Sequence, residues 1–164
     1  MKKLLIYTTV YTLGITALIS AGYASAYEKD SILPHIDKNV QFPLTRWGIG
    51  GKFRHSFRLH VPKNSKAVTQ LIIKLPDNVT VSHDIKNIDI VDDNQHKINT
   101  NVSIKGKTIL LDFTEAVAPN TKFDVDLNKI KRRNIGNGYF YSFSAKEVGI
   151  DAVIPIGIAY FRLY

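Results

Sequence analysis

Short runs in which apolar and polar side chains alternate are the feature that most constrains the fold of this chain. In FRHSFRLHV, residues 53–61, Phe53, Phe57 and Leu59 fall on one side of an extended backbone, whereas Arg54 and Arg58 fall on the other. Alternation with a period of two is typical of a β-strand that buries one face. Further short runs that predict strands lie at residues 68–75, 79–81, 87–92, 98–104, 108–113, 122–127 and 139–144.

Turn signals separate these runs, and helical signals are weak. Gly106 lies in KGK, a tight hairpin signal, because glycine readily adopts a positive φ. After Ala26 no window of ten residues carries a sustained helical period, and the nearest, SAKEVGIDA, is interrupted by Gly149. No segment repeats at a fixed period, which excludes propellers and solenoids. The pattern predicts an all-β fold, an immunoglobulin-like β-sandwich, over residues 53–164.

The N-terminus has the organisation of a secretory signal peptide. Lys2 and Lys3 precede an uncharged stretch that ends in Ala24-Ser25-Ala26. We expect cleavage after Ala26, export to the periplasm, cell envelope or exterior, and no transmembrane segment in the mature chain. The alternative is a retained anchor, because the uncharged run approaches the length of a membrane span. Residues 27–52 contain two prolines, three glycines and no sustained period, and are predicted to be an irregular extension or linker.

The amino-acid composition limits the kinds of chemistry and of binding partner that we expect for this chain. The chain has no cysteine, which excludes disulfides, thiolate nucleophiles and cysteine-ligated zinc. Removal of residues 1–26 takes away Lys2 and Lys3, so 20 of the 22 basic residues remain against 14 acidic ones, a net charge of +6. Such a charge favours polyanionic neighbours. For an exported chain we expect an acidic envelope polysaccharide, lipid headgroups or an acidic protein, and no nucleic acid.

Catalytic and metal-binding motifs are absent from the sequence. It contains no G-x-S-x-G elbow and no H-E-x-x-H motif. His55 and His60 are five residues apart on one predicted strand, so they lie on opposite faces and cannot chelate together. His55 falls on the apolar face and is predicted to be a hydrogen-bonded core residue. The remaining histidines lie in segments predicted as loops: His35, His83 and His96. We therefore predict no catalytic residues, no metal site and no cofactor.

A basic stretch, KIKRRN at residues 129–134, is the strongest candidate for a binding surface. Four cationic side chains are predicted at a strand end and in the following loop: Lys129, Lys131, Arg132 and Arg133. The two arginines offer planar forks for phosphate or carboxylate groups. The aromatic side chains that follow alternate as a buried face does, so we predict that Tyr139, Tyr141 and Phe143 are core residues rather than stacking platforms.

Several short motifs occur together in the C-terminal half: the turn VAPNT, the strand end DLNKIK, the segment SAKEVG and the terminal PIGIA with RLY. On these motifs the chain resembles, over residues 55–164, a family of secreted cyanobacterial proteins with no assigned function. It departs from the family pattern in two places. Asn120 stands where glycine is commoner, and the additional arginine in KRRN makes this segment more basic than in most members. The resemblance implies a signal peptide, one β-rich domain and an envelope or extracellular location, and it implies no catalytic residues.

The leading hypothesis is a non-enzymatic, exported cell-envelope binding or structural module that recognises an acidic polymer or protein surface through the basic stretch. One alternative is a small periplasmic metal-handling protein or hydrolase, which needs a pocket where histidine and carboxylate groups meet. Another is a subunit of a surface assembly that pairs edge to edge through AYFRLY at the C-terminus.

Overall fold

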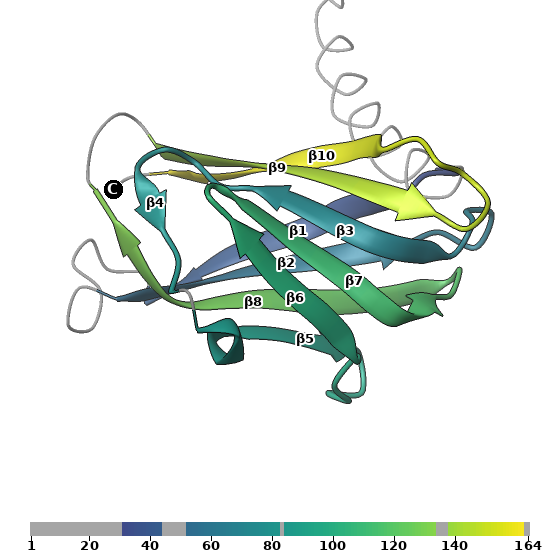
Figure 1. The fold of residues 1–164 in the computed structure, drawn as a ribbon, viewed down its shortest axis with the longest axis horizontal. Helices are drawn as coiled ribbons and strands as arrows, with labels where there is room; N and C mark the ends of the chain where they lie inside the picture. The colour runs from purple at the N-terminus through teal and green to yellow at the C-terminus, as the bar shows by residue number, and fades with distance from the viewer. Residues whose placement is uncertain (1–30, 44–51, 83, 134–137, 163–164) are drawn as a thin grey trace, which may run out of the picture. The chain divides into compact units, whose positions relative to one another are not determined.

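A computed structural model describes residues 31–43, 52–82, 84–133 and 138–162, and almost all regular structure in them is β-strand (Figure 1). The predicted signal peptide, residues 1–26, lies outside the described residues. The elements are β1 (His35–Phe42), β2 (Phe53–Val61), β3 (Val68–Lys74), β4 (Val79–Thr80), a 3-10 turn (Ile85–Asn87), β5 (Ile88–Asp92), β6 (Thr100–Lys105), β7 (Thr108–Val117), β8 (Thr121–Arg132), β9 (Gly138–Glu147) and β10 (Ile154–Arg162).

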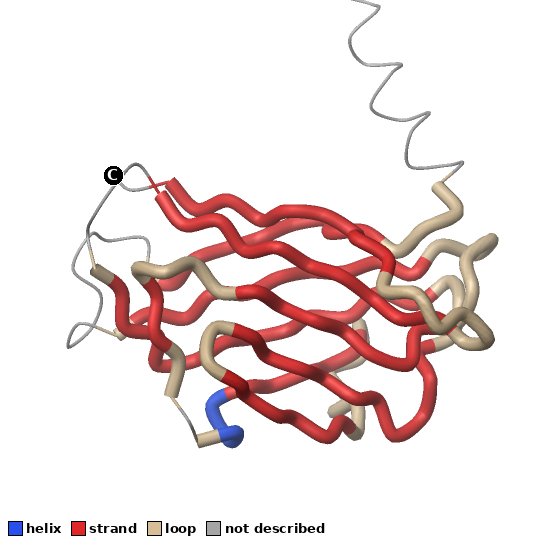
Figure 2. The backbone as a smooth tube through the Cα atoms, turned by 45° about the horizontal axis from the view of Figure 1, so that its top comes forward, coloured by secondary structure: helices blue, strands red, loops and turns tan. Residues whose placement is uncertain are grey.

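The strands form two antiparallel sheets that pack face to face, as Figure 2 shows. One sheet has the order β1-β2-β8-β4, with β5 also paired to β8, and the other has the order β10-β9-β3-β7-β6. This two-layer arrangement confirms the predicted all-β sandwich. In the described part of the chain no helix is long and apolar enough to cross a membrane.

The core lies between the sheets and follows the alternation in the sequence. Along β2, Phe57 and Leu59 are buried, and β9 supplies Tyr141 and Phe143 from the facing sheet. The ring of Phe57 lies 4.9 Å from each of these two β9 rings. Burying an aromatic or leucine side chain stabilises a fold by about 1.5–3 kcal/mol, so this contact holds the sheets together. The predicted core role of the β9 aromatics is confirmed.

Strand β1 corrects the prediction that residues 27–52 are irregular. His35–Phe42 pairs antiparallel with β2, from His35 opposite His60 to Phe42 opposite Arg54. The register shifts between Ile36 and Lys38, so β1 carries one additional residue there, a β-bulge. In the sequence, Lys38 interrupts the apolar positions Ile36, Val40 and Phe42. The bulge also places Ile36 opposite the core residue Leu59 but Phe42 opposite the outward Arg54, so the strand has no single apolar face.

The turn at Gly106 has the predicted positive φ, and β8 is longer than predicted. Gly106 has a φ of 58° between β6 and β7, and Asn120 has a φ of 63° before β8. β8 continues beyond residue 127 to Arg132 and carries an additional residue opposite β2, next to Lys129 with its φ of 53°. Of the four cations predicted at a strand end and in the following loop, three therefore lie within β8 and only Arg133 follows it.

Candidate functional site

The basic stretch lies at the end of β8 beside the short strand β4 (Figure 1). Lys131 is opposite Thr80 on β4, and the backbone N–H of Arg133 donates to the carbonyl of Asn78 at 2.8 Å. The side chains of Lys129, Lys131 and Arg133 are exposed. The structure thus brings these three cations to one end of the sandwich.

Arg132 differs from its neighbours because its side chain packs against the sheet. Its guanidinium carbon lies 3.6 Å from the centre of the Phe53 ring and 5.3 Å from that of Tyr139. Its Nη1 donates to the side-chain oxygen of Gln41 on β1 at 2.5 Å. The Arg132 guanidinium therefore connects β8 to β1 and β2. These contacts stabilise the end of β8, which also carries Lys131.

Two arginines on the outer face of this sheet have acidic partners. Arg58 pairs with Asp93 and, through Nε, with Asp124 at 3.4 Å. Arg54 lies 3.9 Å from Asp126. Within the described residues no ion pair of this kind joins Lys129, Lys131 or Arg133 to a carboxylate. The positive charge at the end of β8 is therefore not neutralised by an ion pair within the described part of the chain.

His55 lies inside the sandwich, as its place in the alternation predicts. Its side chain is fully buried, its ring is stacked on Phe161 with 4.1 Å between centroids, and its Nδ1 is 2.7 Å from the hydroxyl of Tyr141. Burial, reinforced by the charge of Arg132, lowers the pKa of His55 to about 3. A neutral imidazole with its ring stacked in the core is a structural group.

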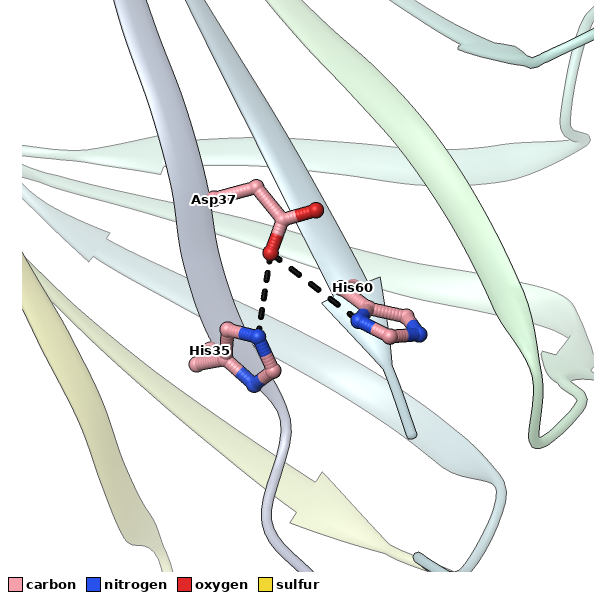
Figure 3. A group of neighbouring side chains, drawn as sticks. All are labelled: His35, Asp37 and His60. Carbon is pink, nitrogen blue, oxygen red and sulfur yellow. Dashed lines mark ion pairs between the residues drawn. The ribbon is translucent and has the colours of Figure 1, made fainter. Parts of the chain in front are cut away.

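A cluster of two histidines and one aspartate was not predicted from the sequence. His35 and Asp37 on β1 and His60 on β2 point toward one another on the outer face (Figure 3). His35 Nε2 lies 3.0 Å and His60 Nδ1 3.9 Å from the same oxygen of Asp37. The second oxygen of Asp37 lies 3.1 Å from Nζ of Lys122 on β8. His35 lies next to His60 only because β1 pairs with β2. The cluster could therefore not be predicted once residues 27–52 were expected to be an irregular linker.

The hydrolase alternative needs histidine and carboxylate groups in one pocket. Among the described residues, a solvent-open pocket lies between the β5–β6 connection and the end of β7. Asp92 and Glu115 are among the residues that line it. None of the described histidines lines this pocket. Asp92 instead organises the local turn, because its Oδ1 accepts the backbone N–H groups of Asn94 and His96, each at 2.8 Å.

Two of the solved structures that are similar to this chain are domains of bacterial adhesins. The N-terminal domain of the Streptococcus gordonii adhesin Sgo0707 is 8% identical with a TM-score of 0.57, over 84% of this chain and 34% of that one. The collagen-binding domain of a Staphylococcus aureus adhesin is 12% identical with a TM-score of 0.45, over 80% of this chain and 96% of that one. The chain thus spans about a third of the first protein's length. The likeness to the Sgo0707 domain agrees with the immunoglobulin-like β-sandwich and shows the fold alone.

At the sequence level, no curated protein matches the chain significantly. A family model described as a protein of unknown function (DUF2808) matches residues 46–154. This range includes the strands from β2 to β9 and the whole basic stretch, and it is well over half of the chain. The resemblance to a family with no assigned function is confirmed in that respect, and the chain belongs to the DUF2808 family.

Proposed function

We propose that this protein is an exported, non-enzymatic binding module that recognises an acidic envelope polysaccharide through the cationic end of β8. The observation that carries the proposal is the exposure of Lys129, Lys131 and Arg133 without a carboxylate partner among the described residues, whereas Arg54 and Arg58 on the same sheet are paired. The predicted signal peptide and the fold shared with a bacterial adhesin domain support the exported, surface-binding role.

The mechanism is electrostatic attraction followed by ion pairing. Exposed cations at one end of a chain with a predicted mature charge of +6 attract a polyanion over about a Debye length, roughly 8–10 Å at physiological salt. Arg132 contributes indirectly, because its contacts with Phe53 and Gln41 fix the end of β8. Binding of this kind weakens as salt is added.

Heparin, a sulfated polysaccharide, is a suitable immobilised probe. We expect retention that decreases steeply with salt, and Lys129→Gln/Lys131→Gln to weaken binding roughly 2- to 30-fold, since exposed ion pairs contribute about 0.2–1 kcal/mol each. Lys63→Gln/Lys66→Gln is the matched control, because it removes two exposed lysines from the β2–β3 connection and leaves the same net charge.

The two double variants separate a site from general charge. Stronger loss of retention in the β8 variant supports the proposal. Equal loss in both variants, or retention that is indifferent to salt, overturns it. Retention on anionic lipid vesicles but not on heparin would assign the cationic end to lipid headgroups instead.

A second candidate function, a subunit of a surface assembly, is favoured by one observation on the outer face of β9 and β10. The rings of Phe140 and Tyr160 are stacked there with 4.6 Å between centroids, and their side chains are 59% and 40% exposed. Exposed apolar groups of this kind are typical of contact surfaces when they form a patch. The molecular mass of the protein in solution distinguishes the two functions, because a subunit of an assembly is expected to associate with itself.

A further inference from the structure

We propose that His35, Asp37 and His60 bind a divalent transition-metal ion of the zinc type, which clamps β1 to β2. One donor atom from each residue lies within 4.8 Å of the other two. Figure 3 shows both imidazole rings turned toward the same carboxylate. The proposal is independent of polysaccharide binding at the end of β8.

The strand pairing creates this arrangement. His35 and His60 are directly opposite each other in the β1–β2 ladder, so their side chains share a face. Asp37 is the additional residue of the β1 bulge, and its carboxylate lies beside both rings. Bulges commonly re-aim a side chain at a functional position.

The distances suit a first-row metal ion. A tetrahedral ion with bonds of about 2.0–2.1 Å holds its donor atoms about 3.3 Å apart. The separations from the Asp37 oxygen, 3.0 Å to His35 Nε2 and 3.9 Å to His60 Nδ1, lie on either side of that value. Small side-chain rotations therefore bring all three donor atoms to bonding distance.

The hydrogen bond of the other His35 nitrogen supports a ligand role. His35 Nδ1 lies 3.2 Å from the carbonyl oxygen of Leu33, which can only accept, so Nδ1 carries a proton. Nε2 then faces the Asp37 carboxylate and requires either a proton or a metal ion between them. A ring N–H donated to a backbone carbonyl is the usual way in which proteins orient a metal-binding histidine.

The remaining contacts define the type of ion. Lys122 occupies the second oxygen of Asp37, which leaves one carboxylate oxygen for the metal. Two imidazoles and one carboxylate favour zinc, nickel or copper over calcium and magnesium, which prefer oxygen ligands. The side chains of His35, Asp37 and His60 are 24%, 14% and 14% exposed, so an ion can enter and water can complete its coordination.

The test is isothermal titration of the chelator-treated full chain with ZnCl2. We expect one zinc ion per chain, no comparable binding of MgCl2, and a higher melting temperature with zinc, because an ion that binds only the folded chain stabilises it. His35→Gln and His60→Gln should each weaken zinc binding by more than about 10-fold and remove the thermal shift, since loss of even an outer-shell partner costs 10- to 100-fold.

His96→Gln is the matched control. His96 also lies beside a carboxylate, with Nδ1 3.4 Å from Asp92, but it is highly exposed and outside the cluster. Its replacement should leave zinc affinity unchanged. Circular dichroism establishes that each variant is folded. The proposal is overturned if the chain binds no zinc, or if the two β1–β2 variants bind it as tightly as the control does. Either result would leave the cluster as a structural contact between β1 and β2.

Discussion

His55 is a titratable side chain enclosed by aromatic rings. Phe161 covers one face of its ring, Tyr141 is hydrogen-bonded to Nδ1, and Nε2 has no hydrogen-bond partner among the described residues. Protonation would place an unsolvated charge in this position, which is why burial lowers the pKa of His55 to about 3. Folding therefore competes with proton binding at this residue.

Acidification should destabilise the protein through His55. The unfolded chain takes up this proton near pH 6.5 and the folded chain only near pH 3, so below 6.5 the unfolded state binds more protons. The free energy of unfolding then falls as the pH falls through this window, by at most about 1.4 kcal/mol per pH unit from this group. We expect His55→Phe to remove this part of the pH dependence, as measured by urea unfolding between about pH 7 and pH 4.

The control for this measurement is His96→Phe, because that histidine is exposed. It should retain the slope of the unmodified chain. At neutral pH, His55→Phe costs stability because the hydroxyl of Tyr141 loses its partner, about 1–3 kcal/mol. If both histidine variants show the same slope, then His55 is not the group whose protonation opposes folding.

At the scale of the strand, β10 depends on a glycine where it passes β1. Gly157 has a φ of 150°, and the register with β9 shifts between Pro155 and Gly157. A Cβ atom on Gly157 would lie 3.3 Å from Cδ1 of Ile36 on β1. Both the backbone angle and the close approach favour glycine at this position.

Gly157→Asn and Gly106→Asn form a matched pair of substitutions. Asparagine tolerates the φ of 58° at Gly106, where nothing lies within 4 Å of the added carbon. At Gly157 the required angle belongs to a region essentially restricted to glycine, which costs about 1–3 kcal/mol. Thermal or urea unfolding should therefore show a clearly larger loss of stability for Gly157→Asn. Equal losses would mean that β10 adjusts its path at little cost.

The strands also show which features the sequence could predict. The range of β2 was predicted correctly because its alternation is unbroken from Phe53 to Val61. β1 was missed because Lys38 interrupts its short apolar series, and the histidine cluster was missed with it, since His35 meets His60 only through strand pairing. The packing of Arg132 on Phe53 could not be predicted either, because 79 positions separate the two residues in the sequence. Local periodicity predicts strands, whereas sites depend on register between distant segments.

At the scale of the whole molecule, the sandwich must protect its sheet edges, because an unpaired strand invites pairing with another chain. β10 is at one edge of its sheet, and β1 lies beside it. The side-chain Nδ2 of Asn39 on β1 donates to the backbone carbonyl of Tyr160 on β10 at 2.9 Å. β4, at an edge of the other sheet, is only two residues long. Both features oppose edge-to-edge association.

We therefore expect the predicted mature chain, residues 27–164, to be a monomer in light scattering at micromolar concentration. The exposed pair of Phe140 and Tyr160 is the feature that opposes this expectation, because it places apolar area on the outer face of the sheet rather than at its edge. A dimer mass that reverts to that of one chain on Phe140→Ser would show that this face mediates association and would favour the assembly function. A dimer unaffected by Phe140→Ser but lost when β10 is shortened would instead mean that β1 does not protect the edge. A single-chain mass in both the unmodified and the Phe140→Ser proteins would count against the assembly function.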